Sequence, residues 1–205
     1  CDVVTENFRS GVMDRLGLGY EDFKTANPKI IYASGSGWGA DNYMAEKGMP
    51  GQDLLIQAMS GVMFNTGRRD DPPTACGTPI ADFAASQALA IGILGALLAR
   101  DRHGIGQRVE TSLYSATLNL MGQENFAVLN QGIELERSGA GIASCWNDAP
   151  YGAHPTSDGF VAIAMCPLDK LADILEDVGL ADMDPWNQRD ETKLRIDEST
   201  RTKTT

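Results

Sequence analysis

Short runs of β-branched and aromatic residues alternate with segments of helical spacing in the first part of the chain. Cys1–Phe8 and Lys29–Ser34 are two such runs, and both are typical of buried strands. Between them the sequence predicts two short helices, Gly11–Leu16 and Tyr20–Ala26. Helices between strands imply right-handed crossovers, so we expect an α/β fold with a doubly wound, mainly parallel sheet, an incomplete Rossmann-like large domain.

The next segments are mostly helical and follow a glycine-rich loop at Gly35–Gly51. Apolar residues recur at helical spacing in Gln52–Phe64, a third strand is predicted at Gln107–Ser112, and another helix at Leu113–Asn130. Ala81–Arg100 is the longest predicted helix. It is apolar on most of its faces, which predicts a central position.

The last third of the chain has a different organisation. Gly139–Ala153 is irregular and rich in glycine, which suggests a crossing into a second domain. A hydrophobic strand at Gly159–Met165 and an amphipathic helix at Leu168–Val178 follow. We therefore expect residues 1–138 to be part of the large domain, and residues 139–205 to be a linker with the start of a smaller α+β domain.

Composition and charge exclude some classes of protein. With 42% hydrophobic and 22% charged residues among 205, the chain resembles an ordinary soluble globular protein. The net charge of −11 argues against nucleic acid as a partner, because nucleic-acid binding needs a basic face to displace counterions. No run approaches 18 consecutive apolar residues, and Gly92 and Gly95 break the longest, Ala88–Ala99. We therefore expect no transmembrane helix and no membrane association.

The positions of the cysteines and histidines indicate the cellular compartment and whether a metal site is expected. The four cysteines, at positions 1, 76, 145 and 166, are far apart and show no CxxC spacing, which predicts free thiols in a reducing cytoplasm. His103 and His154 have no partner at ligand spacing, so we expect both at the surface and no metal site. Neither end of the sequence carries a terminating element, and we expect it to be an internal piece of a longer chain.

Acidic residues at helix starts are the remaining candidates for chemistry, because the sequence has no GxSxG, Walker or GxGxxG motif. Asp82 lies in the first turn of the longest predicted helix, where the helix dipole and free N–H groups would stabilise its charged form as a nucleophile. A plain capping role is the commoner use of such an aspartate. The same two interpretations apply to Asp53, which follows Gln52 at the start of its own helix. Arg15 is most simply a solvated arginine.

Several spaced motifs carry a family resemblance. They are DVVTENFRSG at 2–11, RLGLGY at 15–20, NPKIIY at 27–32, SGWG at 36–39, GQD at 51–53, GTPIAD at 77–82, GILGALL at 92–98 and GIGQ at 104–107. In this order they resemble family III CoA-transferases, which include formyl-CoA transferase, carnitine CoA-transferase and α-methylacyl-CoA racemase. The resemblance runs over about the first 165 residues.

The resemblance implies roles for individual residues. Asp82 falls on the family's catalytic aspartate, and four residues fall on positions that contact CoA: Asn7, Phe8, Arg15 and Leu16. The implied reaction transfers CoA between carboxylic acids through an aspartyl anhydride and an aspartyl-CoA thioester. Backbone N–H groups at the start of the helix would stabilise the oxyanions. Coenzyme A is then a substrate, no cofactor is permanently bound, and the full-length protein is an interlocked homodimer.

Two active-site neighbours bear on which reaction is catalysed. Asp53 falls where formyl-CoA transferase has a glutamate, and Gln52 falls where racemases of the family have a proton-shuttling histidine. Because an amide does not titrate near neutral pH, Gln52 favours transfer over racemisation. The alternatives are an acyl-CoA racemase or isomerase, and a non-catalytic homologue that acts as a dimerisation unit. The sequence does not name the donor and acceptor acids.

Overall fold

The computed structural model describes residues 1–204 and separates the chain into two compact units. The first unit consists of Cys1–Val62 and Ala75–Asn130, and the second of Met63–Thr74 with the residues from Gln131 onward. The division into domains after residue 138 stays a prediction, and these units differ from it by placing residues 63–74 and 131–138 in the second.

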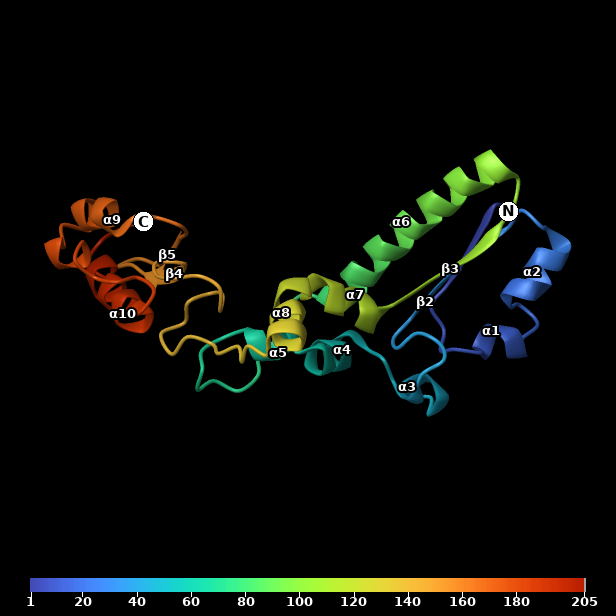
Figure 1. Cartoon of the computed structure of the whole chain (residues 1–205), viewed down its shortest axis with the longest axis horizontal. Coiled ribbons are helices and arrows are strands. Elements are labelled where there is room, and N and C mark those ends of the chain that lie inside the picture. The colour runs from blue at the N-terminus through green and yellow to red at the C-terminus, as the bar shows by residue number, and fades with distance from the viewer. Residues whose placement is uncertain (205) are drawn as a thin grey trace. The chain divides into compact units, whose positions relative to one another are not determined.

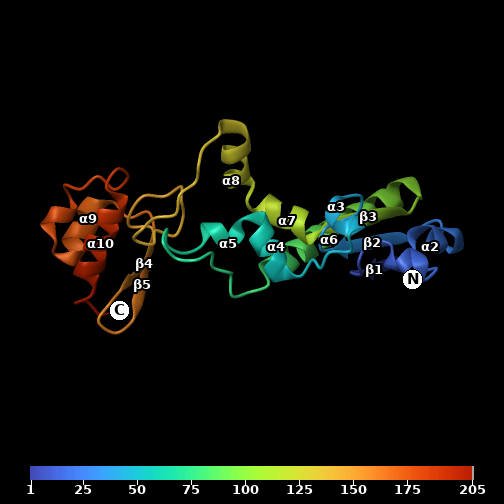
Figure 2. The ribbon, with the colours of Figure 1, turned by 90° about the horizontal axis from the view of Figure 1, so that it is seen from below.

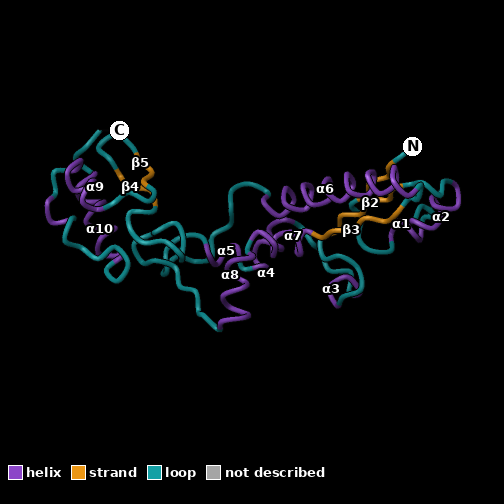
Figure 3. Tube along the Cα trace, turned by 45° about the horizontal axis from the view of Figure 1, so that its top comes forward, coloured by secondary structure: helices purple, strands orange, loops and turns teal. Residues whose placement is uncertain are grey.

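A parallel sheet of three strands forms the centre of the first unit. The strands are β1 (Val3–Glu6), β2 (Ile31–Ser36) and β3 (Gln107–Ser112), in the order β1-β2-β3, and both pairs are parallel. Figure 3 shows the three strands alongside the long helix α6 (Ile80–His103). In the central strand β2, the side chain of Ile31 is fully buried, as the β-branched pattern predicted. The predicted mainly parallel α/β sheet is confirmed.

Helices cover both faces of this sheet (Figure 1). On one face, α2 (Tyr20–Ala26) places the rings of Tyr20 and Phe23 at 6.1 and 6.0 Å from the ring of Tyr32 in β2. On the other face, Leu89 of α6 lies against Gly35, three residues farther along the same strand. The doubly wound arrangement follows from these opposite contacts. A further helix, α4 (Asp53–Ser60), packs against α6 and α7 (Leu113–Leu120) (Figure 2).

The helices up to residue 131 follow the predicted pattern with some interruptions. They are α1 (Val12–Arg15), α2 (Tyr20–Ala26), α3 (Tyr43–Glu46), α4 (Asp53–Ser60), α5 (Val62–Asn65), α6 (Ile80–His103), α7 (Leu113–Leu120), α8 (Gly122–Phe126) and a π-helical turn (Ala127–Gln131). The helix predicted at Gln52–Phe64 is divided at Gly61, whose φ of 92° ends α4 in a conformation that favours glycine. The helix predicted at Leu113–Asn130 is similarly divided at Met121, and α3 lies within the predicted loop Gly35–Gly51.

The long helix α6 packs against β2, β3, α4 and α7, but most of its large apolar side chains are exposed. Its buried residues are three alanines, at 81, 85 and 96, whereas Ile91 and Leu94 are 70% and 66% exposed. By length and composition alone α6 could span a membrane, although the core helix of a soluble protein passes the same test. Length and composition therefore do not exclude a transmembrane helix, contrary to the prediction from the sequence. An apolar pattern shows which positions need cover, but not whether the same chain provides it.

The second unit has a two-stranded antiparallel sheet and helices. Its elements are β4 (Gly152–Pro155), β5 (Phe160–Ile163), α9 (Leu168–Leu175), a 3₁₀ turn (Val178–Leu180) and α10 (Arg189–Thr200). The strand predicted at Gly159–Met165 and the helix predicted at Leu168–Val178 are therefore present. Leu171, Leu180 and Ile196 are among the residues that form its apolar core.

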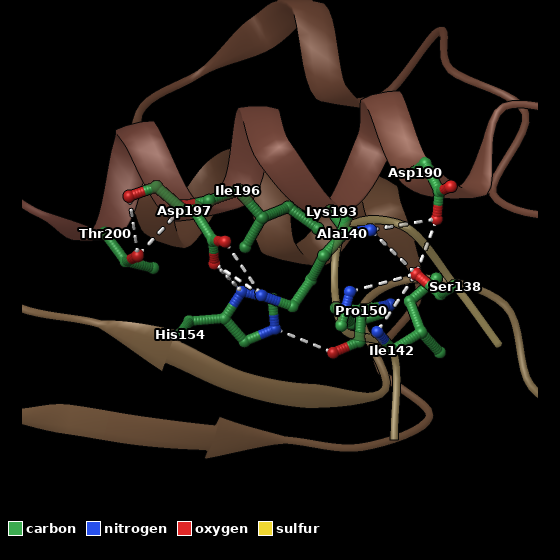
Figure 4. A network of polar contacts seen from close by, with 11 residues as sticks. Ser138, Ala140, Ile142, Pro150, His154, Asp190, Lys193, Ile196, Asp197 and Thr200 are labelled. Carbon is green, nitrogen blue, oxygen red and sulfur yellow. Dashed lines mark hydrogen bonds and ion pairs between the residues drawn. The ribbon is translucent and has the colours of Figure 1, made fainter. Parts of the chain in front are cut away.

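A buried polar network crosses this second unit (Figure 4). The Lys193 ammonium donates to both carboxylate oxygens of Asp197, at 2.7 and 2.8 Å, and the lysine is 2% exposed. His154 is fully buried, with Nδ1 at 2.8 Å from Asp197 Oδ1 and Nε2 at 2.7 Å from the Pro150 carbonyl oxygen. Burial lowers the pKa of His154, and the contact with Pro150 opposes that effect. The predicted surface position of His154 is wrong, because its partner lies 43 residues farther along the chain.

Candidate active site

Three cavities lie where the strands of the parallel sheet end. One of about 330 Å³ is lined by residues that include Asn7, Gly51 and Asp82. A second, of about 200 Å³, shares Asn7 and adds Phe8 and Gln52. A third, of about 270 Å³, extends past the ends of all three strands. Ligands of open α/β sheets bind outside the carboxyl ends of the strands, so these cavities are the candidate site.

Asp82 lies in the first turn of α6, with its carboxylate exposed at the wall of the 330 Å³ cavity. Partial burial, and then the negative charge of Asp53, raise the pKa of the Asp82 carboxyl. This is the reverse of the stabilised anion expected from a helix start. The amides of this turn, which would stabilise that anion, already have another acceptor.

That acceptor is Asp53. Its Oδ1 accepts hydrogen bonds from the backbone N–H of Ala81, at 2.8 Å, and of Asp82, at 3.3 Å. Asp53 therefore does cap a helix, as expected, but the helix is α6 and not its own helix α4. The other first-turn amides, of Ile80 and Phe83, donate to backbone carbonyls. The oxyanion site expected from free N–H groups of this helix start is not present, since these amides are engaged.

Gln57 is a residue that the sequence interpretation missed. Its side chain is 1% exposed, its Nε2 donates to Asp53 Oδ2 at 2.7 Å, and its Oε1 accepts from the Cys76 backbone N–H at 2.8 Å. Gln57 lies one helical turn after Asp53 on α4. A polar residue among the apolar positions of a predicted amphipathic helix was the available signal.

Two glycines bring α4 to the end of the sheet. A Cβ atom built on Gly37 would lie 2.4 Å from the Cα of Gly51, and one built on Gly51 would lie 2.6 Å from the Cα of Gly37. Only backbones without side chains can approach this closely. The contact joins the segment after β2 to the residue before Gln52, and so places the start of α4 beside the cavities.

The remaining predicted site residues divide into two groups. Asn7, Phe8 and Gln52 line the 200 Å³ cavity together, and Phe8 is 53% exposed. Arg15 and Leu16 are exposed at the end of α1 and do not line any of the three cavities. Their assignment to a CoA site stays a prediction.

Two further observations describe the site's charge and metal chemistry. Arg9, which the sequence interpretation did not single out, contributes a cationic side chain to two of the cavities. Among residues 1–204, no cluster of three or more histidine, cysteine, aspartate or glutamate residues is arranged to hold a metal ion.

Comparisons with known proteins place this geometry in a family. The model of CoA-transferase family III matches residues 1–205. The chain is 42% identical over 161 residues to an acyl-CoA transferase of Fusarium pseudograminearum, covering 78% of this chain and 34% of that protein. It is 46% identical over 119 residues to the acetyl-CoA:oxalate CoA-transferase of Acetobacter aceti, covering 58% of this chain and 30% of that protein.

Solved structures agree with the sequence matches. The fold resembles a CAIB/BAIF family protein from Brucella suis with a TM-score of 0.81 and 32% identity, covering 99% of this chain and 55% of that one. The chain therefore spans about a third of the curated relatives named above and about half of this structural one. A match to the family model over the whole sequence leads to one conclusion: the chain belongs to CoA-transferase family III.

Proposed function

We propose that the protein transfers coenzyme A between carboxylic acids, with the Asp82 carboxylate as the nucleophile. The observation that carries this proposal is the exposed Asp82 carboxylate at the wall of a cavity beyond the ends of the parallel strands. Relatives named as acyl-CoA transferase and acetyl-CoA:oxalate CoA-transferase support the same reaction class. Coenzyme A and its thioesters are substrates in this proposal.

The proposed reaction has two matched halves. The Asp82 carboxylate attacks the thioester carbonyl of the acyl-CoA, the C–S bond breaks, and an aspartyl mixed anhydride and the CoA thiolate form. The thiolate attacks the aspartyl carbonyl, which releases the first acid and leaves an aspartyl-CoA thioester. The acceptor carboxylate attacks this thioester, and the released thiolate then takes the acyl group from the second anhydride. Asp82 is regenerated as a carboxylate.

Asn7 is the side chain best placed to assist this chemistry. It lines both the cavity of Asp82 and the neighbouring cavity, and its carboxamide has no hydrogen-bond partner among residues 1–204. Because the first-turn amides of α6 are engaged, we assign stabilisation of the developing oxyanion to the Asn7 carboxamide. Phe8 supplies an apolar wall, and Arg15 and Leu16 are assigned to the more distant part of coenzyme A.

Gln52 favours transfer over α-epimerisation. Its exposed side chain lines the cavity of Asn7 and Phe8, next to Asp53 in sequence. A racemase needs a group that takes and returns the α-proton, and an amide does not titrate near pH 7. Wild-type protein incubated with acyl-CoA in D₂O should therefore incorporate no deuterium at the α-carbon, and measurable incorporation would favour the racemase instead.

The proposal extends to assembly and compartment. We propose that the full-length protein acts as a homodimer of interlocked chains in the cytoplasm, as the family resemblance implied. The exposed apolar side chains along α6, including Ile91 and Leu94, support burial of this helix by polypeptide outside the described residues.

The decisive experiment traps the intermediate. The complete gene product is incubated with a panel of acyl-CoAs and hydroxylamine, and the peptide that contains Asp82 is examined by mass spectrometry. We expect a hydroxamate on Asp82 with the correct donor, and a loss of transfer of at least about 10³-fold in Asp82→Asn.

Asp101→Asn is the matched control, because Asp101 is exposed near the other end of the same helix and makes no described contact. This variant should transfer CoA at the wild-type rate. An unmodified Asp82 peptide in protein that binds CoA, or full activity in Asp82→Asn, would overturn the proposal.

A further inference from the structure

The side chain of Gln57, within α4, makes hydrogen bonds to two different parts of the chain. Its amide is buried, and it bridges two elements: Nε2 donates to Asp53 Oδ2 and Oε1 accepts from the Cys76 N–H. Cys76 belongs to the loop that leads into α6. One end of the bridge therefore holds Asp53 and the other holds the approach to the helix that carries Asp82.

The bridge requires an amide in particular. The contact with Asp53 needs a donor, whereas the contact with Cys76 needs an acceptor, and a carboxamide supplies both. A carboxylate at position 57 would oppose the Asp53 carboxylate, and an apolar side chain would leave the Cys76 N–H without this partner. A lysine could donate to Asp53 but could not accept from Cys76.

The side chain of Gln57 is also uncharged, so it bonds Asp53 without neutralising the Asp53 carboxylate. Asp53 accepts from Gln57 and from two backbone amides, and makes no ion pair with a cation among residues 1–204. Its charge is thus hydrogen-bonded but not cancelled. The same charge contributes to the raised pKa of the neighbouring Asp82 carboxyl.

We propose that Gln57 is a positioning residue for CoA transfer: it fixes the rotamer of Asp53, and through the cap that Asp53 forms on α6 it fixes the place of Asp82. Gln57 touches neither cavity and acts only through Asp53. The inference rests on the proposed role of Asp82 as the nucleophile.

The test is an exchange of partners across the bridge in the complete gene product. Gln57→Glu is nearly isosteric and should lower kcat about 10- to 100-fold, with KM for the acyl-CoA changed less than about threefold. The double variant Asp53→Asn/Gln57→Glu keeps both ends of the bridge, because the amide introduced at position 53 donates to the carboxylate introduced at position 57, which still accepts from the Cys76 N–H. Only the two long contacts of Nε2 with the carbonyl oxygens of Cys76 and Thr78, both at 3.5 Å, are lost. The double variant should recover kcat to within about threefold of wild type at neutral pH.

The pH profile separates positioning from folding. In the double variant the negative charge moves from position 53, which caps α6, to position 57, which makes no hydrogen bond to α6, so the acid limb of kcat should move to lower pH than in wild type. All rates are expressed per Asp82 trapped as hydroxamate, which removes the contribution of misfolded protein. Gln123→Glu, an exposed glutamine of α8 given the same charge, is the matched control and should match wild type.

The outcomes distinguish the two proposals. If Asp82→Asn is inactive while Gln57→Glu keeps the wild-type kcat per trapped site, the positioning role is wrong and the proposed function stands. Failure of the double variant to recover kcat also contradicts the positioning role. If Asp82→Asn keeps full activity, the proposed function itself falls.

Discussion

Each of the two units has a carboxylate at the centre of a hydrogen-bond network, and the two carboxylates have different kinds of partner. Asp53, in the first unit, accepts from neutral donors only, which are two backbone amides and Gln57. Asp197, in the second unit, accepts from the ammonium of Lys193 and contacts the ring of His154, in a site that is almost fully buried. Both carboxylates are satisfied, but only the second has its charge cancelled by a cation.

The kind of partner separates a carboxylate that stabilises the fold from one that acts on a neighbouring group. A buried charge is expensive unless it is paired, so the pair of Lys193 and Asp197 is what a structural core requires. Asp53 caps α6 beside the cavity that Asp82 lines, and its negative charge acts on the adjacent Asp82. Neutral partners therefore accompany the carboxylate that bears on the proposed chemistry, and a charged partner accompanies the one that bears on stability.

The largest expected effect comes from breaking the buried pair. Lys193→Met should reduce the free energy of unfolding of the second unit by about 3–5 kcal/mol, because it leaves a buried carboxylate without its main partner. The measurement is hydrogen exchange of the amides of α10, which should lose protection. Lys170→Met, at an exposed lysine of α9, is the control and should change little. A Lys193→Met protein with wild-type protection would show that His154 alone sustains Asp197.

A smaller effect is expected from neutralising the other carboxylate. Asp53→Asn places an amide against the Gln57 amide, and the loss of one hydrogen bond of about 1.4 kcal/mol predicts a roughly tenfold lower kcat. Because the charge of Asp53 raises the pKa of Asp82, and Asp82 must be ionised to attack, removing that charge should shift the acid limb of kcat to lower pH. An acid limb at unchanged pH would mean that Asp53 does not act on Asp82 electrostatically.

The smallest effect concerns acid stability. Burial lowers the pKa of His154 below its ordinary 6.5, so the folded protein binds this proton less readily than the unfolded chain. The stabilising contribution is therefore present above about pH 6.5 and is lost as the pH falls through the lower folded value. Urea unfolding of wild type should show this loss between neutral and mildly acidic pH. His154→Gln should show a smaller one, and identical pH dependence in the two proteins would contradict the prediction.

The sequence by itself determined the regular elements and much of the chemistry. The period-two and helical patterns predicted Tyr20–Ala26 and Gln107–Ser112 with the bounds that the structure has, because local periodicity reports which face of an element is buried. The motifs also indicated CoA-transferase family III, which the family model confirms. Asp82 at the start of a long helix was visible from the residues that precede that helix.

Only the tertiary structure decided what those residues touch. Asp53 caps a helix that starts 27 residues later, and His154 meets Asp197 across 43 residues, distances over which local pattern carries no information. The structure also revealed Gln57 as a bridge, and α6 as a helix with an exposed apolar face. The physical reason is the same in each case: periodicity records the need for burial or hydrogen bonding, while the partner that meets the need is chosen by folding of the whole chain.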